Sequence, residues 1–237
     1  MVRLDKAVAL TGMTRTEARK AIAAGRVQVN GQAARDHGMQ VEPRDVTVDG
    51  RPVEVPGEIY LMIHKPAGVV TATEDRALPT VSDLLPESVR RRGPGPVGRL
   101  DRDVTGLVLM TTNGQLAHRL ISPKWKAEKV YRARCEGELT ESDVEAFASG
   151  MALSDFVALP AKLEILSAGG GESLADVVLT EGKFHQVKRM FAAVGHPLIG
   201  LKRLRIGPIA LDESLAPGEW RMLTAEEAAA LLAQCGL

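Results

Sequence analysis

Cysteine is scarce in this sequence. Its two copies, Cys135 and Cys235, lie far apart in a chain of 237 residues, and neither belongs to a Cys-x-x-Cys pair. This spacing excludes a metal site with four cysteine ligands and argues against a disulfide framework. The histidines at positions 64, 118 and 196 also lack the spacing of metal ligands. We therefore expect no metal centre.

Long apolar runs and aromatic side chains are also rare. No apolar stretch approaches the ~18 residues that a membrane span needs, and we find no secretory signal pattern. We therefore expect a cytoplasmic protein without a membrane partner. Aromatic residues make up only 3% of the chain, so few side chains can stack on a nucleic-acid base.

A net charge of one sign is absent as well, because 30 Lys and Arg residues balance 30 Asp and Glu residues. Zero net charge argues against a general polyanion binder, so only a local cluster of positive charge can indicate RNA binding. A length of 237 residues allows one substantial core and a second, smaller one.

A stretch with unusual chemistry, GRLDRDVTGLVLMTTNG, occupies residues 98–114. Its apolar segment, residues 106–110, is typical of a buried strand. The Asn-Gly pair that follows predicts a turn, and the spacing of apolar residues over 115–121 predicts a helix.

Asp101 lies inside this stretch, between Arg99 and Arg102 and just before the predicted strand. We expect the adjacent guanidinium groups to hold its carboxylate ionised. Two interpretations fit this position. One is a loop aspartate in a surface ion pair, and the other is a nucleophile mounted on a turn that rigid structure anchors.

The stretch GRLDRDVTGLVLMTTNG resembles the signature of the pseudouridine synthases, in the RsuA-type branch that modifies ribosomal RNA. The phrase HKPAGVVTAT at residues 64–73 is similar to the same family. The resemblance implies that Asp101 is the catalytic nucleophile. It also implies that no cofactor is needed, because pseudouridine formation requires no redox step and no group donor.

Two further motifs carry the resemblance. KVYRA, at residues 129–133, places Tyr131 on a predicted strand. By composition a strand tyrosine usually belongs to the core, whereas the family implies that Tyr131 stacks on the target base and assists proton transfer. GKFHQVKRMFAAVG, at residues 182–195, implies that Lys188 contacts the catalytic Asp101. Relatives often carry arginine at this position. Lysine has the same charge but cannot form the two parallel hydrogen bonds that arginine makes with a carboxylate.

Basic residues gather around these motifs, and we predict that they contact RNA phosphates. No acidic residue occurs between Glu181 and Asp212, and an irregular basic loop over 89–98 follows a short helix predicted over 78–85. A solvated or merely flexible surface is the alternative interpretation. The contacts predicted here are Arg90, Arg91, Arg92, Arg99, Arg102, Lys183, His185, Gln186 and Arg189.

The first fifty residues contain a second basic region. Residues 2–9 are compatible with a helix, Thr14 and Glu17 form the pattern of a capping box, and the alternation over 26–30 and 46–48 predicts short strands. RLDK, TRTEARKAI and GRVQVNG resemble the S-four-type RNA-binding module. A solvated helix face is the alternative. The RNA contacts that the resemblance implies are Arg3, Lys6, Arg15, Arg19, Lys20 and Arg26.

Two prolines and a glycine within residues 51–57 indicate a linker. We predict an S-four-type RNA-binding domain over 1–52, a linker over 53–58 and a pseudouridine synthase catalytic domain over 59–237. The expected fold is α+β. A small α/β module is followed by a mixed, largely antiparallel sheet with flanking helices.

These features predict a pseudouridine synthase that acts, as a monomer, on one uridine of small-subunit (16S) ribosomal RNA or of an assembling small subunit. The target uridine must leave its stack before it can react. Its N1–C1′ bond then breaks, and the base rejoins the sugar through C5. Attack by Asp101 at C1′ and attack at C6 both stay open.

Three alternatives remain at this stage. The target could be large-subunit (23S) ribosomal RNA, or the protein could be a non-catalytic RNA-binding or ribosome-assembly factor that uses the same basic faces. A hydrolase acting on a glycosidic bond would need a second carboxylate. Asp103 is the near candidate, and we expect it to face away from Asp101 in an extended turn.

Overall fold

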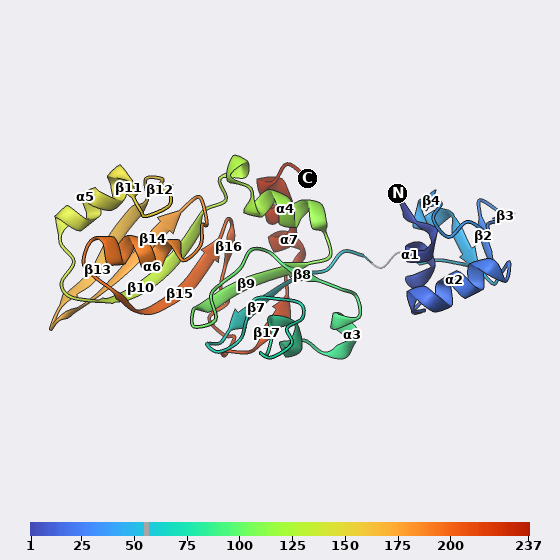
Figure 1. The fold of residues 1–237 in the computed structure, drawn as a ribbon, viewed down its shortest axis with the longest axis horizontal. Coiled ribbons are helices and arrows are strands. Elements are labelled where there is room, and N and C mark those ends of the chain that lie inside the picture. Colours follow the sequence, from blue (N-terminus) through green and yellow to red (C-terminus); the bar gives the residue numbers. More distant parts are fainter. Residues whose placement is uncertain (55–56) are drawn as a thin grey trace. The chain divides into compact units, whose positions relative to one another are not determined.

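The computed structural model describes residues 1–54 and 57–237, which form two compact units with a boundary between Gly57 and Glu58. Figure 1 shows the elements of both units. Val53 is 3% exposed and packs in the core of the first unit, so ordered packing continues into the predicted linker. Positions 55 and 56 of that linker lie outside the described residues.

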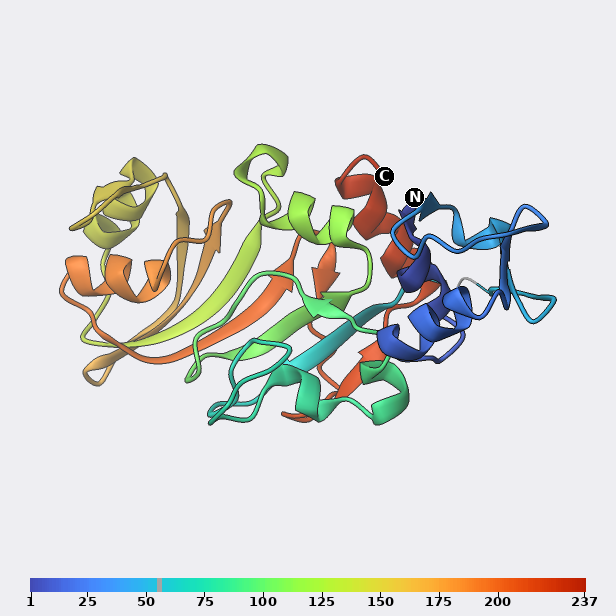
Figure 2. The same cartoon turned by 45° about the vertical axis from the view of Figure 1, so that its right-hand side comes forward.

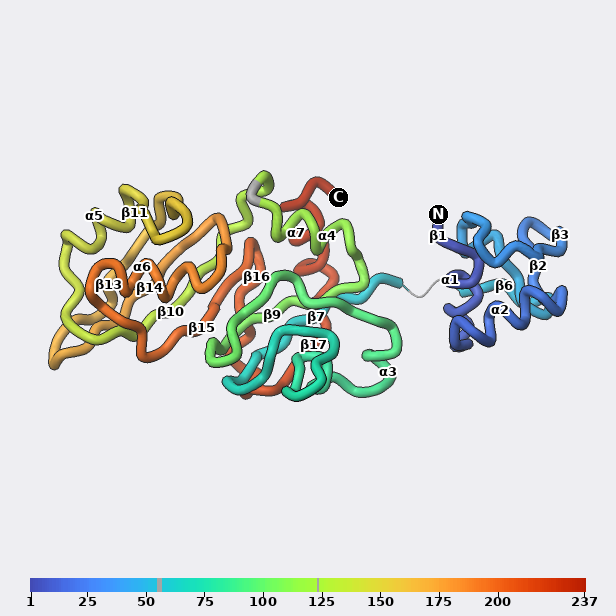
Figure 3. The backbone as a smooth tube through the Cα atoms, in the orientation of Figure 1, coloured from blue at the N-terminus to red at the C-terminus, as the bar shows by residue number. Residues whose placement is uncertain are grey.

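The N-terminal unit packs two short helices against small strands, and Figure 3 traces its path. Thr14 and Glu17 form the predicted capping box, in which each side chain accepts a hydrogen bond from the other residue's backbone. The elements are β1 (Val2–Arg3), α1 (Leu4–Ala9), α2 (Arg15–Ala23), β2 (Val27–Val29), β3 (Gln32–Ala33), β4 (Gln40–Val41), the 3-10 helix η1 (Pro43–Asp45), β5 (Val46–Val48) and β6 (Arg51–Pro52).

Two local predictions in this unit were wrong. The helix predicted over 2–9 begins at Leu4, because Val2 and Arg3 pair instead with Val41 and Gln40 as a two-stranded ladder. Arg51–Pro52, which the prolines suggested was linker, pairs with β5 as an edge strand. Proline is tolerated at such an edge, because no neighbouring strand needs the N–H that proline lacks.

The second unit is built on a nine-stranded sheet with the path β13-β14-β10-β15-β9-β7-β17. Every strand pair in it is antiparallel except β9 with β15, so the predicted mixed, largely antiparallel α+β fold is confirmed. Its strands are β7 (Tyr60–Lys65), β8 (Gly95–Pro96), β9 (Thr105–Thr111), β10 (Lys129–Glu136), β13 (Lys162–Gly169), β14 (Glu172–Leu179), β15 (Leu198–Ile206), β16 (Ile209–Ala210) and β17 (Trp220–Met222).

Helices cover both faces of this sheet. Alternate residues of β9 enter two separate cores, Val108 into the one that α5 and α6 cover and Leu107 into the one that α4 and α7 cover. Figure 2 shows the long strands β10 and β15 side by side. The remaining elements are η2 (Val81–Leu84), α3 (Glu87–Arg90), α4 (Gly114–Ile121), η3 (Pro123–Trp125), α5 (Glu141–Ser149), β11 (Met151–Ala152), β12 (Val157–Ala158), α6 (Gln186–Ala193) and α7 (Ala225–Gln234).

The segment before Asp101 is more ordered than predicted. The helix expected over 78–85 is only the 3-10 turn η2, which Thr80 and Asp83 cap. A short helix, α3, follows it and reaches into the stretch that was predicted to be irregular.

The parallel pair β9–β15 requires glycine at position 106. Gly106 lies opposite Arg203 and has a φ of +103°, and a Cβ atom there would lie 2.2 Å from the backbone oxygen of Arg203. An L-residue could occupy this position only if one of the two strands moved. The contact therefore fixes the spacing between the strand that follows Asp101 and the strand that neighbours Tyr131.

Gly106→Ala should lower the free energy of unfolding of the second unit by about 3 kcal/mol, through overpacking and backbone strain. Both tryptophans, Trp125 and Trp220, lie in that unit, so denaturant titration followed by tryptophan fluorescence reports on it. Gly114→Ala is the matched control, because nothing lies within 4 Å of its added Cβ atom. Equal stability of the two variants would contradict the steric argument.

Candidate active site

Asp101 lies on the loop that leads into β9, and buried neighbours fix this loop from behind. The buried Thr71 hydroxyl donates to the Leu100 carbonyl at 2.9 Å and accepts from the Leu100 N–H at 3.1 Å. The Val104 N–H donates to the Asp101 carbonyl at 3.2 Å and closes a turn. The backbone on both sides of Asp101 is therefore held in one conformation.

Lys65, at the end of β7, supports the same loop from inside the protein. Its side chain is fully buried, and its ammonium donates to the carbonyls of Pro66, Arg102 and Val104 at 3.0, 3.1 and 2.7 Å. Burial lowers the pKa of Lys65 to about 8, although the nearby negative charge of Asp101 acts in the opposite direction. From the sequence, Lys65 was noted only as part of the phrase HKPAGVVTAT.

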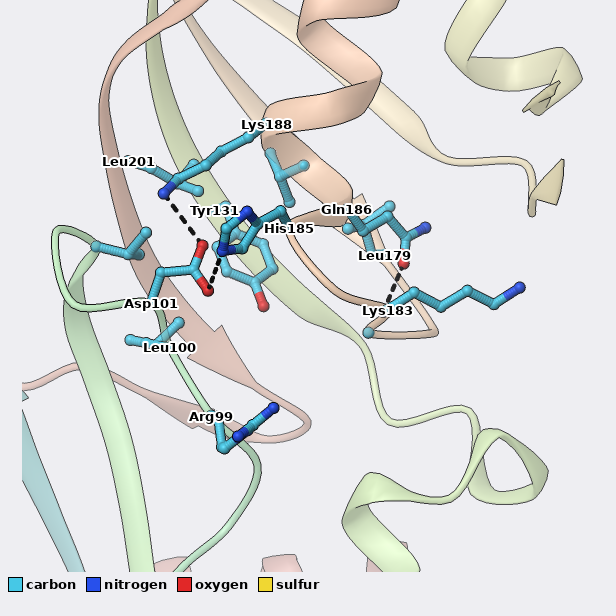
Figure 4. A pocket seen from close by; sticks show the side chains of 13 residues that line it. Arg99, Leu100, Asp101, Tyr131, Leu179, Lys183, His185, Gln186, Lys188 and Leu201 are labelled. Carbon is cyan, nitrogen blue, oxygen red and sulfur yellow. Dashed lines mark hydrogen bonds and ion pairs between the residues drawn. The ribbon is translucent and has the colours of Figure 1, made fainter. Parts of the chain in front are cut away.

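The Asp101 carboxylate forms an ion pair with Lys188 of α6, with Nζ 3.1 Å from Oδ2. Figure 4 shows both side chains pointing into the same space. The same ammonium contacts Asp103 Oδ1 at 2.8 Å and Oδ2 at 2.9 Å. Burial alone would lower the pKa of Lys188, but the hydrogen bonds that its ammonium donates to Asp103 and Asp101 outweigh burial and raise the pKa above its ordinary value. Lys188 therefore stays a cation.

Asp103 does not face away from Asp101 as predicted, because Lys188 draws both carboxylates to one point. The hydrogen bond from Lys188 also lowers the pKa of Asp103 below its ordinary range. The side chain of Asp101 is 29% exposed, so it remains accessible to a ligand while it is paired.

His185 approaches Asp101 from a second direction, with Nε2 3.4 Å from Oδ1. It precedes α6 in the left-handed backbone region, at a φ of +52°, which turns its ring toward the loop. The ring of Phe184 stacks on it at 3.8 Å and is 69% exposed. In a chain with few aromatic residues, this pair places two stacked rings beside the carboxylate.

Tyr131 lies on the predicted strand, β10, and its side chain faces the core side of the strand, opposite to Arg132. On β15 the register passes from Arg205 to Arg203 while β10 advances by one residue to Tyr131, so Leu204 forms a bulge beside it. Such bulges re-aim side chains next to active sites. Tyr131 is 8% exposed, and its ring borders the cavity that contains Asp101.

One cavity brings together the three predicted catalytic residues. Arg99, Lys183, His185 and Gln186 also lie in its wall. Its full lining is Arg99, Leu100, Asp101, Val104, Tyr131, Leu179, Gly182, Lys183, His185, Gln186, Val187, Lys188 and Leu201.

The arginines next to Asp101 in the sequence are not its partners. Arg102 Nε donates instead to the Gly68 carbonyl at 3.3 Å, and Figure 4 marks no contact between Arg99 and Asp101. The prediction that neighbouring guanidinium groups stabilise the Asp101 carboxylate is therefore wrong. The positive charge beside this carboxylate belongs to Lys188, which is distant in the sequence.

Several predicted RNA contacts are committed to partners within the protein. Gln186 is 3% exposed, and its amide donates to Glu181 Oε1 at 2.7 Å and accepts from the Lys183 N–H at 3.0 Å. It builds the loop before α6 and leaves no free group for RNA. Arg189 pairs with Asp155, and this carboxylate partly neutralises the charge that Arg189 could offer to a ligand.

The basic clusters elsewhere are also partly neutralised. Glu87 accepts from both Arg90 and Arg91, at 2.7 and 2.8 Å. In the N-terminal unit the fully buried Asp5 pairs with Arg3 at 3.2 Å and with Arg19 at 3.0 Å. Arg26 forms a two-bond pair with Asp49. The other exposed cations on α1 and α2 are Lys6, Arg15 and Lys20.

Within residues 1–54 and 57–237, no group of three or more His, Cys, Asp or Glu side chains could hold a metal ion. The same part of the chain contains no helix long and apolar enough to cross a membrane. Cys135 and Cys235 are buried free thiols in different cores.

Residues 59–193 match the model of the RNA pseudouridylate synthase family, and residues 2–47 match that of the S4 domain. The chain belongs to the RNA pseudouridylate synthase family. It is therefore an isomerase that acts on RNA, with an S4-type RNA-binding domain at its N-terminal end.

Whole-length relatives agree with this assignment. The chain is 43% identical over 230 residues to "Uncharacterized RNA pseudouridine synthase YtzG" of Bacillus subtilis, covering 95% of this chain and 96% of the relative. It is 42% identical over 236 residues to "Ribosomal small subunit pseudouridine synthase A" of Escherichia coli, covering 98% of this chain and 100% of the relative. A crystal structure described as pseudouridylate synthase superposes with a TM-score of 0.70 at 37% identity, over 98% and 100% of the two chains.

Sequence reasoning missed Lys65 and Thr71 as supports of the Asp101 loop. A lysine at the end of the apolar strand β7, where charge is costly unless it is hydrogen-bonded, was the available signal. The three carbonyls that it binds are distant in the sequence, so their identity could not be predicted from the pattern.

The stability of the N-terminal unit should fall as the pH decreases from about 4 to about 2. The hydrogen bond from Arg3, and then that from Arg19, lower the pKa of Asp5 from 3.8 to about 2. A carboxyl with a lowered folded-state pKa stabilises the fold above its unfolded pKa, and this stability is lost as the pH falls through the folded value.

NMR signals of α1 and α2, followed from pH 7 to pH 2, measure this loss. Asp5→Asn should be less stable at pH 7 and should show a flatter dependence on pH. Asp45→Asn is the control, because Asp45 forms no ion pair among the described residues. An Asp5→Asn profile parallel to that of the unmodified protein would refute the assignment.

Proposed function

We propose that this chain converts one uridine of small-subunit (16S) ribosomal RNA to pseudouridine, with Asp101 as nucleophile, Lys188 as its ionic partner and Tyr131 as the surface that receives the base. The observation that carries the proposal is the carboxylate of Asp101, accessible in a cavity and held at 3.1 Å by a lysine that remains charged.

The chemistry requires a carboxylate with a fixed direction of attack. Thr71 and Lys65 hold the loop behind Asp101, and Lys188 holds its side chain in front. The Asp101 carboxylate forms a bond to the nucleotide, at C1′ or at C6, and the N1–C1′ bond breaks. After the base turns, a C5–C1′ bond forms and the bond to the carboxylate breaks, which frees Asp101. N1 gains a proton and C5 loses one, so the reaction balances without an oxidant or a donor.

The target uridine must be extruded from its stack, which costs a few kcal/mol. Tyr131 offers a ring beside Asp101 for the extruded base. The exposed ring of Phe184, stacked on His185, offers a second aromatic surface at the rim. Base–aromatic stacking of ~1–3 kcal/mol per base can offset the cost of extrusion.

A glycosidic hydrolase fits this geometry less well. Such enzymes place one protonated and one ionised carboxyl on opposite sides of the bond. Here Lys188 draws Asp101 and Asp103 to the same ammonium, and it lowers the pKa of Asp103. Neither carboxyl is placed to act as the protonated acid.

The names of relatives support the small-subunit target. The Escherichia coli protein and one from Vibrio parahaemolyticus, which is 44% identical over 230 residues, are both named ribosomal small subunit pseudouridine synthase A. We further propose that the protein works as a monomer, because Asp101, Tyr131 and Lys188 of a single chain suffice to form the site. We also propose that it works in the cytoplasm. A large-subunit target and a non-catalytic RNA-binding role are the outcomes that the following experiments would detect.

Asp101→Asn should reduce pseudouridine formation by at least about 10³-fold, because the amide cannot act as a nucleophile. RNA binding should persist, since the phosphate contacts are unchanged. Pseudouridine content is measured by mass spectrometry after incubation with ribosomal RNA, and binding is measured by filter retention.

Asp103→Asn is the matched control for Asp101→Asn, since it neutralises a neighbouring carboxylate on the same lysine. Its activity should stay within about tenfold of that of the unmodified protein. If Asp101→Asn kept full activity, or if both variants lost activity equally, the assignment of Asp101 would fail.

Deletion of the gene in its host should abolish pseudouridine at a single position of 16S ribosomal RNA. The unmodified protein should restore it, and Asp101→Asn should not. Chemical mapping of pseudouridine across both ribosomal subunits checks this. Loss of pseudouridine at a 23S position would instead mean that the target lies in the large subunit, and the proposed chemistry would still hold.

A further inference from the structure

A second cavity adjoins the one that contains Asp101. The two share Arg99, Tyr131 and Gly182, so Tyr131 borders both. The rest of the second wall comes from the start of the Asp101 loop, the end of α4, and the strands β10 and β15. Its full lining is Val97, Gly98, Arg99, Leu120, Ile121, Lys129, Tyr131, Gly182, Arg203 and Ile206.

The charge of this second cavity is entirely positive. Arg99, Lys129 and Arg203 lie in its wall, and none of the described lining residues is acidic. Apolar side chains make up most of the remainder. Such a wall repels cations and favours an anion, because water is partly excluded and the positive charges are weakly screened.

Arg203 has hydrogen-bonding capacity that the protein does not use. It is 3% exposed, and its Nε donates to the Leu107 carbonyl at 2.8 Å. Its Nη2 is buried and has no hydrogen-bond partner in the described part of the chain. A guanidinium group cannot lose its proton in a protein, so an unpaired buried N–H is costly unless a ligand supplies an acceptor.

The surroundings of Lys129 also disfavour its positive charge. Burial, and then the nearby charge of Arg203, lower its pKa, although the negative charge of Glu181 acts in the opposite direction. Its ammonium forms no ion pair among the described residues. An anion between Lys129 and Arg203 would remove the repulsion and offer acceptor oxygens to both groups.

We propose that this cavity binds a phosphodiester of the RNA strand next to the target uridine. The inference rests on the proposed function, because it takes the neighbouring cavity as the uridine site. A phosphodiester carries one negative charge and several acceptor oxygens, which matches the two guanidinium groups and the ammonium. With the phosphate on one side of Tyr131, the adjoining nucleotide enters the cavity of Asp101 on the other side.

Lys129→Met tests the proposal, and Lys162→Met is the matched control. Lys162 lies on the edge strand β13 and pairs with Glu164, outside both cavities. Lys129→Met should reduce kcat/KM for a ribosomal RNA fragment about tenfold, as expected for a lost charged hydrogen bond. It should also lower the slope of log affinity against log salt by about 0.7. Lys129→Arg should keep most of the activity, and Lys162→Met should match the unmodified protein.

Substrates with one neutral methylphosphonate linkage locate the phosphate. Linkages on either side of the target uridine are replaced one at a time. At one linkage, the methylphosphonate should reduce the activity of the unmodified protein about as much as Lys129→Met reduces activity on native RNA. The same methylphosphonate should cause no further loss in the Lys129→Met variant. Equal rates for Lys129→Met and Lys162→Met, or additive losses at every linkage, would overturn the phosphate site.

Failure of the proposed function gives a different result. If the unmodified protein formed no pseudouridine in any ribosomal RNA, inorganic phosphate would still test the cavity. Millimolar phosphate should then raise the thermal unfolding temperature of the unmodified protein and of Lys162→Met more than that of Lys129→Met. Tryptophan fluorescence before each assay establishes that Lys129→Met is folded, and a phosphate response equal in all three proteins would refute the site.

Discussion

One ammonium group joins the two parts of the active site. Lys188 Nζ contacts Asp101 at 3.1 Å and Asp103 at 2.8 Å, and it links the loop before β9 to helix α6. Opposite charges at this distance attract strongly where water is partly excluded, and the lysine remains a cation because both carboxylates raise its pKa. Without this contact, only the His185 ring among the described side chains, with Nε2 3.4 Å from Oδ1, would orient the carboxylate of Asp101.

The sheet makes that contact possible. The parallel pairing of β9 with β15 places Gly106 against the backbone of Arg203, and β15 in turn lies beside Tyr131 on β10. Thr71 and the buried Lys65 hold the backbone of the Asp101 loop, whereas Lys188 holds its side chain. A nucleophile fixed from two sides needs little reorganisation when charge develops during the reaction.

Motifs predicted the catalytic centre because they contain its reacting residues. Asp101, Tyr131 and Lys188 were each chosen from a separate motif, and the fold brings all three to one cavity. The helix over 115–121, where α4 lies, was predicted from the spacing of its apolar residues, because the helical period is a local property. Their chemical roles in this chain remain predictions until variants are measured.

Long-range partners could not be predicted in the same way. Arg102 was assigned to Asp101 because they are adjacent in the sequence, yet the structure gives that role to Lys188. Arg3 and Arg19 were assigned to RNA, although Asp5, buried between them, pairs with both. Which cations are free depends on carboxylates that only the fold brings close.

The most direct test of the account is a structure of the Asp101→Asn variant bound to RNA that contains the target uridine. The account predicts an extruded uridine against Tyr131, with the side chain at position 101 about 3–3.5 Å from C1′ or C6 of that nucleotide, the range of a near-attack geometry. RNA bound along the protein with every base still stacked, and with the side chain at position 101 out of reach of any nucleotide, would contradict it.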